Sequence, residues 1–188
     1  PVEEGLKEDV MPSRYRNRVR YFLDWEFHED GRIIEPISIG LLCENGQKLH
    51  MVSSEFDESV CNDFVVKNVL PFLPEGPRFT RAEIRKEIES FISKTSLALG
   101  KAPEFWAYYA DYDWVLFCQQ WGGMVYLPKG FPQYCNDLMQ VMYERGLTRN
   151  DLPTQVGRAH DALSDAEWVR DGLDFIETHD LRSGRVER

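Results

Sequence analysis

An apolar segment near the start of the chain is interrupted by two acidic residues. Residues 21–27 (YFLDWEF) are aromatic or aliphatic except for Asp24 and Glu26. In a β-strand, residues i and i+2 point to the same face, so both carboxylates leave one side of the strand. Two like charges there are costly to desolvate unless a cation lies between them, and Mg²⁺ prefers carboxylate oxygens. The pair therefore predicts a metal site, although an isolated pair is also typical of an edge strand with a solvated face.

A second acidic segment follows a later apolar stretch. Residues 109–113 (YADYD) carry Asp111 and Asp113 where a predicted strand gives way to a predicted helix. Ligands bind at the carboxyl ends of strands in open α/β sheets, so either carboxylate is placed for a site. Each residue also has a structural alternative, because Asp commonly caps a helix or forms a turn at such a junction.

A third candidate is the segment HDALSD, in which His160 precedes Asp165 by five residues. On one continuous helix the two side chains would be separated by about 140° around the axis. They can converge only if His160 lies in the lead-in and Asp165 lies inside the helix. Gly157 permits an irregular entry of that kind. Alone, a histidine at a helix start is typical of a polar surface.

The elements that must position these residues are indicated by apolar patterns and capping signals. Asn45-Gly46 between two apolar runs predicts that the second and third strands form an antiparallel hairpin. The capping box TRAE starts a helix at Thr80. Strands are expected at 21–27, 36–43, 47–52 and 104–109 and, as a short strand or turn, before Asn136; helices are expected at 59–70, 80–100, 113–121, 136–146 and 160–178. This order predicts an α/β fold: a central mixed five-stranded sheet, its first three strands antiparallel, flanked by helices.

Length and composition fit a single folded domain. The 188 residues include 43% hydrophobic residues, and no apolar run approaches the roughly 20 residues that span a bilayer. We expect one domain at 21–178 between a charged N-terminal tail (1–20) and a C-terminal tail (179–188). The charged N-terminus does not resemble a signal peptide, so we expect a cytoplasmic protein with no membrane partner.

The net charge of −10 argues against a protein that holds long nucleic acid by neutralising phosphates. It does not argue against an enzyme that captures one strand end, because bound divalent cations would reverse the field of a carboxylate cluster. The arginines at 14, 16, 18 and 20 could contact a nucleic-acid backbone, but they are expected in a solvated tail. The four scattered cysteines show no metal-ligand spacing and are expected to be ordinary core residues.

Together, the order and spacing of these segments resemble the DEDDh exonucleases, which have the ribonuclease H-like fold. Asp24 and Glu26 match the first motif, Asp113 fits the second better than Asp111, and His160 with Asp165 matches the third. The resemblance covers residues 21–177. It is greatest to small stand-alone enzymes named polyadenylate-specific 3′-exoribonuclease AS, through the stretches EPISIGLL, NVLPFLP and LPKGFPQYCNDL. Trp25 stands where the family usually has Thr, and alternation points it away from the expected metals.

The resemblance implies a metal-dependent 3′→5′ exonuclease that releases nucleoside monophosphates from single-stranded ends, with RNA expected before DNA. Two Mg²⁺ or Mn²⁺ ions would be held by Asp24, Glu26, Asp113 and Asp165, with Asp24 as the expected bridge. His160 would take the proton from the attacking water, a role suited to imidazole. A homodimer is also implied. Aromatic residues that could stack a base are Trp25, Tyr109, Tyr112 and Trp114, although their spacing also suits a core.

Two other functions remain open from the residues. His160-Asp161 is an HD dipeptide, as in metal-dependent phosphohydrolases, but those proteins are all-helical and need further histidines. The second alternative is a nuclease fold kept as a nucleic-acid-binding module without catalysis. Because every expected ligand is present, the sequence favours an enzyme.

Overall fold

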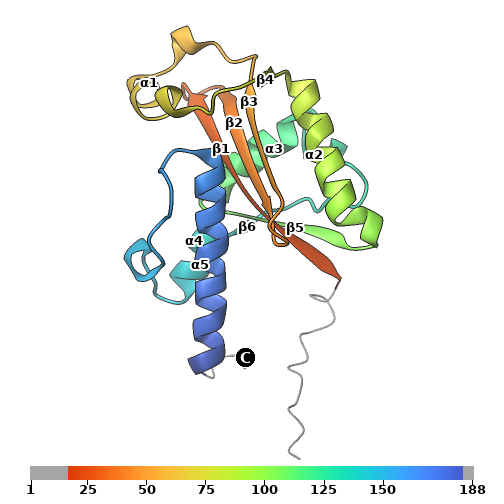
Figure 1. Ribbon diagram of the computed structural model, residues 1–188, viewed down its shortest axis with the longest axis vertical. Helices are drawn as coiled ribbons and strands as arrows, with labels where there is room; N and C mark the ends of the chain where they lie inside the picture. The colour runs from red at the N-terminus through yellow and green to blue at the C-terminus, as the bar shows by residue number, and fades with distance from the viewer. Residues whose placement is uncertain (1–16, 184–188) are drawn as a thin grey trace, which may run out of the picture.

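The sheet of this protein has six strands and carries helices on both faces (Figure 1). The structure is a computed structural model and describes residues 17–183, with side chains to 179. The strands are β1 (Arg18–Glu29), β2 (Ile34–Cys43), β3 (Lys48–Ser53), β4 (Arg78–Phe79), β5 (Ala102–Ala107) and β6 (Asn136–Asp137). The helices are α1 (Asp63–Asn68), α2 (Arg81–Thr95), α3 (Ala110–Gln119), α4 (Leu138–Glu144) and α5 (Ala162–Ser183). Short 3-10 turns lie at Glu58–Val60, Leu70–Phe72, Leu97–Leu99, Met124–Tyr126 and Arg149–Asp151.

The strand order is β4-β3-β2-β1-β5-β6, so β1 lies inside the sheet. β2 and β3 pair antiparallel, as the Asn-Gly turn predicted, and β1 pairs antiparallel with β2. β5 pairs parallel with β1, and β6 pairs parallel with β5. A β-bulge interrupts the β1–β2 register between Glu26 and Phe27. The mixed α/β sheet is confirmed. Because the protein has a six-stranded sheet, the all-helical phosphohydrolase alternative is excluded.

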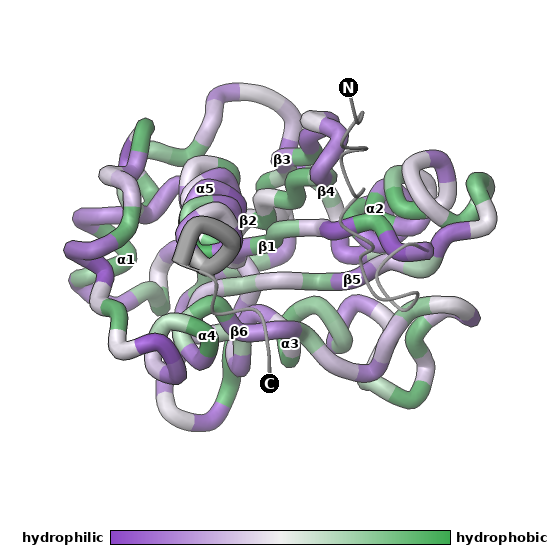
Figure 2. The backbone as a smooth tube through the Cα atoms, turned by 90° about the horizontal axis from the view of Figure 1, so that it is seen from below, coloured by the Kyte–Doolittle hydropathy of each residue, from purple (hydrophilic) through white to green (hydrophobic). Residues whose placement is uncertain are grey.

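Alternation along β1 divides its side chains between two cores. Tyr21, Leu23 and Trp25 pack with Ile84 and further residues of α2 and α3 on one face. On the other face Phe22 packs with residues of α4 and α5. Seen end-on, α5 and α2 lie on opposite sides of the sheet (Figure 2). The strand is therefore apolar on both faces, as an interior strand must be, except where its even-numbered positions become acidic.

Several expected elements differ from the structure. The sheet has six strands rather than five, because β4 is a two-residue parallel partner of β3 that no sequence period could reveal. The helix expected at 59–70 is broken into α1 and two 3-10 turns: Asn62 caps α1 as a separate helix, and Pro71, which cannot continue an α-helix, lies in the second 3-10 turn. α3 begins at Ala110 rather than Asp113, and Asp137 rather than Asn136 caps α4.

Both ends of the folded region also differ from expectation. β1 begins at Arg18, where Arg18 pairs with Glu104 at 3.0 Å and Arg20 pairs with Glu177 at 2.9 Å. Half of the arginine run therefore belongs to the sheet rather than to a solvated tail. α5 continues to Ser183 rather than ending near residue 178. The rest of the two expected tails lies outside the described residues.

Gly40 on β2 allows α5 to approach the sheet. A Cβ added at this position would lie 2.2 Å from the backbone oxygen of Ala162, the first residue of α5. Gly40 also pairs with Asp24 across the β1–β2 ladder. The absence of a side chain at one position thus brings the start of α5 to the acidic part of β1.

We expect Gly40→Ala to lower the free energy of unfolding by about 3 kcal/mol or more, because a methyl group there must displace backbone. It should also separate α5 from the carboxylates of β1. Gly46→Ala is the control: its Cβ would meet open space, and its φ of +89° should cost about 1 kcal/mol. Urea unfolding measures both variants. Equal stability of the two would contradict the close packing.

Candidate active site

Three carboxylates from the two ends of the chain converge on one point. Asp24 and Glu26 leave the same face of β1, and Asp165 reaches them from the first turn of α5. One ligand oxygen from each lies within 4.8 Å of those of the other two. Carboxylates at this separation can share divalent cations, which prefer oxygen ligands.

Asp113 faces the same cleft from the first turn of α3. Its Oδ1 accepts a 2.7 Å hydrogen bond from the backbone N–H of Trp25, between the two acidic residues of β1. Asp113 is buried, whereas Asp111 is exposed and does not line the cleft. Asp113 lies outside the group of three whose oxygens are within 4.8 Å. The preference for Asp113 over Asp111 therefore agrees with burial and orientation.

His160 lies in the lead-in to α5, as its convergence with Asp165 required. Its φ of +63° is unusual for a residue other than glycine, and its backbone N–H donates to Asp165 Oδ2 at 2.8 Å. The imidazole meets the edge of Phe64, with 4.9 Å between ring centroids. Asp161 has a structural role instead, since its Oδ1 accepts from the N–H of Ser164 in the first turn.

The acidic cluster is electrostatically unfavourable without a cation. Burial, with repulsion from Asp113 and Glu26, raises the pKa of Asp24 well above its usual range. Burial and the charges of Asp165 and Asp113 raise the pKa of Glu26 to about 8. Burial raises the pKa of Asp113 to about 7, against the lowering effect of the Trp25 N–H. Burial likewise raises that of Asp165, although hydrogen bonds from Gln155 and His160 oppose it. Divalent cations would relieve this repulsion, so the donor set fits them.

The cluster opens into a cleft of about 510 Å³. Aromatic rings form much of its wall, and Tyr109 (60% exposed), Phe64 (53%) and Tyr112 (46%) present large faces to solvent. Phe27 and Tyr112 stack with centroids 5.4 Å apart. The residues lining the cleft are Asp24, Trp25, Glu26, Phe27, Glu29, Asn62, Phe64, Val65, Val69, Tyr108, Tyr109, Tyr112, Asp113, Arg149, His160 and Asp165.

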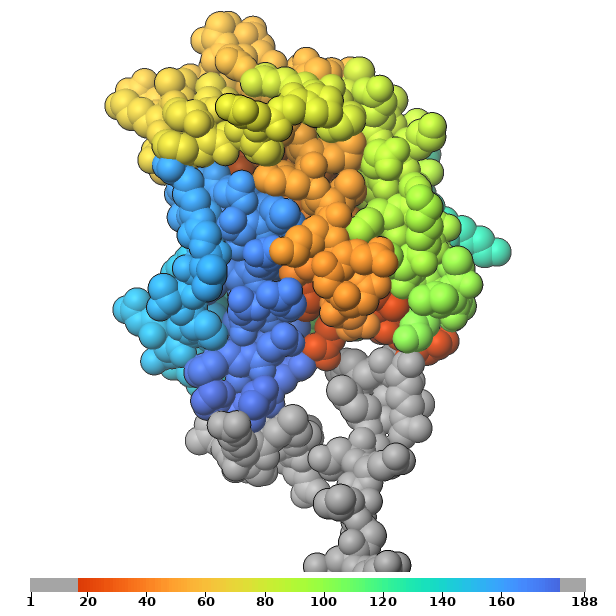
Figure 3. Space-filling model, viewed as in Figure 1, coloured from red at the N-terminus to blue at the C-terminus, as the bar shows by residue number. Residues whose placement is uncertain are grey.

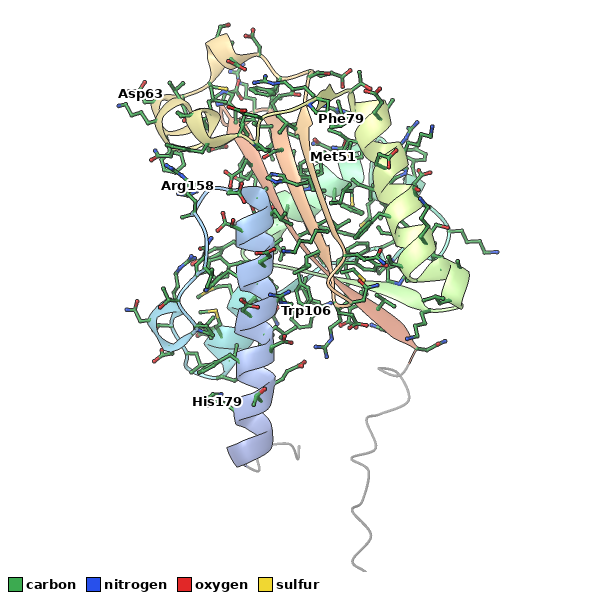
Figure 4. The ribbon with its side chains drawn as sticks, viewed as in Figure 1. Met51, Asp63, Phe79, Trp106, Arg158 and His179 are labelled. Carbon is green, nitrogen blue, oxygen red and sulfur yellow. The ribbon has the colours of Figure 1, made fainter. Side chains whose placement is uncertain are left out.

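One wall of the cleft was not anticipated. It comes from the segment around α1, which lies against the loop preceding α5 (Figure 3). Arg158 on that loop lies between α1 and the start of α5 (Figure 4), and its guanidinium packs on the ring of Phe72. Asn62 caps α1 and donates its backbone N–H to His28 Nδ1 at 3.3 Å. The cap was the one local signal for this wall.

The aromatic residues considered for base stacking fall into two groups. Tyr109 and Tyr112 are exposed in the cleft, whereas the side chains of Trp25 and Trp114 pack into the core on the α2 and α3 face. The unusual Trp25 is therefore accommodated behind the acidic strand. The alternation of side chains along a strand predicts that Trp25 points away from the acidic face. It does not reveal which tyrosines remain exposed.

The fold is shared with a solved nuclease structure, cell-death related nuclease 4 (CRN-4). The two align with a TM-score of 0.50 at 13% identity, over 88% of this chain and 66% of that one. At that identity the likeness concerns the fold alone. No family model matches the sequence.

Sequence relatives define the family. The chain is 39% identical over 151 residues to proteins named 3′-5′ exoribonuclease from two strains of Mycobacterium tuberculosis, CDC 1551 and H37Rv. The alignment covers 79% of this chain and 87% of each relative. The chain therefore belongs to this family of 3′-5′ exonucleases and is a nuclease. Among the described residues, no helix is long and apolar enough to cross a membrane.

The raised pKa values predict that metal binding strengthens with pH. Because protons must leave Glu26 (pKa about 8) and Asp113 (about 7) before a cation binds, affinity for Mg²⁺ or Mn²⁺ should increase between pH 6 and 8. The increase should be about ten-fold per pH unit for each proton displaced. Without metal the sign reverses: a carboxyl whose pKa is raised on folding loses stabilisation as the pH rises from about 4, where unfolded carboxyls titrate, to the raised pKa of about 7 for Asp113 and about 8 for Glu26.

Calorimetric titration in two buffers of different ionisation enthalpy would count the protons released. Asp24→Asn is the control and should bind weakly at every pH. Metal affinity that is constant from pH 6 to 8, with no proton release, would contradict the assignment of these carboxylates as ligands.

Proposed function

We propose that this protein is a DEDDh-type exoribonuclease with a ribonuclease H-like fold, which shortens single-stranded RNA from its 3′ end to nucleoside monophosphates. The observation that carries the proposal is the meeting of Asp24, Glu26, Asp113, His160 and Asp165 in one cleft. These residues match all three motifs of the resemblance, and they come from β1, from α3, and from α5 with its lead-in.

Two Mg²⁺ or Mn²⁺ ions fit the donor set, with Asp24, Glu26, Asp113 and Asp165 as ligands. When bound, such ions activate a water for attack on the phosphodiester and stabilise the charge on the leaving oxygen. The carboxylates have a further effect of their own. Because all of them are held by strands or by first turns of helices, they orient the ions without a large loss of side-chain entropy.

His160 is the candidate general base. Its backbone is fixed by Asp165, while its imidazole lies at the cleft against Phe64. Imidazole can accept a proton from water near neutral pH and release it to solvent afterwards. Its exposed position beside the carboxylates suits a group that must exchange protons in every cycle.

The exposed aromatic wall supports a single-stranded substrate. Bases of an unpaired strand can stack on Phe64, Tyr109 or Tyr112, and such stacking is sequence-tolerant. We propose RNA rather than DNA as the substrate because the relatives at 39% identity are named exoribonucleases. The homodimer and the cytoplasmic location expected from the sequence stay predictions.

The decisive experiment incubates 5′-labelled single-stranded RNA and matched DNA with the protein, with and without Mg²⁺ or Mn²⁺. A metal-dependent ladder that shortens from the 3′ end is expected, with RNA degraded faster than DNA. Asp24→Asn should abolish nearly all turnover, because it removes a charge from the shared ligand position. Asp111→Asn is the matched control, since this neighbouring carboxylate is exposed and lies outside the cleft.

Each other result has a meaning. Near-wild-type cleavage by Asp24→Asn would overturn the site. Faster degradation of DNA would overturn the substrate class and leave the mechanism intact. Binding of RNA without cleavage by the wild type would favour the binding module instead.

We expect His160→Ala to lower the turnover number by about 10²–10⁴, because the general base is lost while the carboxylates remain. The rise in melting temperature on adding Mn²⁺ should be retained. His179→Ala, on the exposed far part of α5, should behave as wild type. Loss of the metal-dependent stabilisation in His160→Ala would show that this residue acts as a ligand rather than as a base.

A further inference from the structure

One arginine is held over aromatic rings at the rim of the cleft. The Cζ atom of Arg149 lies 4.0 Å from the ring centroid of Trp168 and 5.6 Å from that of Tyr108. Trp168 is itself buried and fixed, since its Nε1–H donates to the backbone oxygen of Pro153 at 2.9 Å. A guanidinium stacked in this way has lost its freedom before any ligand arrives, so it can bind a ligand at low entropic cost.

The turn that carries Arg149 is also fixed. Arg149 opens a 3-10 turn with a capping box, in which Asp151 Oδ2 accepts from both the N–H and the hydroxyl of Thr148, at 2.8 and 2.7 Å. The backbone and the end of the side chain are therefore held independently. This double restraint is more than a solvent-facing arginine needs.

Gln155 connects this arginine to the acidic cluster. Arg149 Nη2 donates to Gln155 Oε1 at 2.9 Å, and Gln155 Nε2 donates to Asp165 Oδ1 at 2.8 Å. A primary amide can accept from a guanidinium and donate to a carboxylate at the same time. The three side chains form a continuous path from the rim of the cleft to a candidate metal ligand.

The negative charge of the cleft indicates what Arg149 could bind. Of the described residues that line the cleft, Arg149 is the one lysine or arginine, against the five carboxylates of Asp24, Glu26, Glu29, Asp113 and Asp165. A polyanionic strand must find a cation there besides the divalent ions. A guanidinium has five N–H donors in a fork that matches phosphate, so the bond to Gln155 leaves others available.

We propose that Arg149 binds a backbone phosphate of the strand lying in the cleft, and that Gln155 is a positioning residue linking this contact to Asp165. The ligand class, a phosphodiester strand, rests on the proposed function. Arg149 touches substrate, whereas Gln155 acts through its two neighbours. Binding of the strand and orientation of one metal ligand are thereby coupled.

Arg149→Ala should raise the KM for a fluorescein-labelled ten-nucleotide RNA by about ten-fold and change kcat less. The plot of log KM against log salt concentration should also become less steep by about 0.7, the contribution of one phosphate in a single strand. Arg149→Lys should restore the salt slope but only part of the affinity, because lysine cannot form the fork. Arg85→Ala removes an exposed charge on α2, away from the cleft, and should change neither quantity.

Gln155→Ala should lower kcat about ten-fold and weaken the Mn²⁺-dependent rise in melting temperature, as loss of an outer partner of a metal ligand does. The free-energy losses in kcat/KM caused by Arg149→Ala and by Gln155→Ala should sum to more than the loss in the double variant, because both changes break one path. Circular dichroism would verify that each variant is folded.

If the wild type is active and Arg149→Ala has the same KM and salt slope as Arg85→Ala, the proposal is overturned while the exonuclease function stands. If Arg149→Ala and Gln155→Ala add independently, the positioning role is overturned. If the wild type degrades no nucleic acid, the proposed function fails first. Direct binding of the labelled RNA, by fluorescence anisotropy in Mn²⁺, would then still compare Arg149→Ala with Arg85→Ala.

Discussion

The close contact between the first turn of α5 and β2 is the constraint on which the candidate site depends. Gly40 leaves room for the backbone of Ala162, and because Gly40 pairs with Asp24, this contact lies beside the acidic face of β1. Asp165 then needs only one turn of helix to reach the cluster. The same contact therefore packs the core and brings the candidate ligands together. A side chain at Gly40, which performs no chemistry, would disturb both.

The site concentrates negative charge in a chain that is already acidic, with a net charge of −10. Such a cluster opposes folding by its mutual repulsion and its desolvation, and this is visible in the raised pKa values of Asp24, Glu26 and Asp113. The apolar residues on the reverse face of β1 offset that cost by burial against α2 and α3. One strand thus stabilises the fold through Tyr21, Leu23 and Trp25 on one face, while its other face changes from the buried Phe22 to the acidic Asp24 and Glu26.

The parts of the structure that follow local periods were predictable from the sequence. The same-face placement of Asp24 and Glu26, the hairpin at Asn45-Gly46 and the capping box at Thr80 all appear as expected. The short strand β4 and the broken helix around α1 were not, because tertiary pairing rather than local pattern determines such brief elements. The contact between Gln155 and Asp165 was equally hidden, since it depends on how an irregular loop folds back.

The order of the candidate ligands along the chain has a consequence for synthesis. β1 leaves the ribosome early with two of the carboxylates and Asp113 follows on α3, but the fourth lies on α5, after every other helix and strand that the structure describes. A growing chain can build much of the sheet and still lack Asp165 and His160. Because chains emerge from their N-terminal end, the candidate site would be completed only by the last helix to appear. Until α5 has been made and has docked, the carboxylates of β1 lack the helix that completes the candidate site.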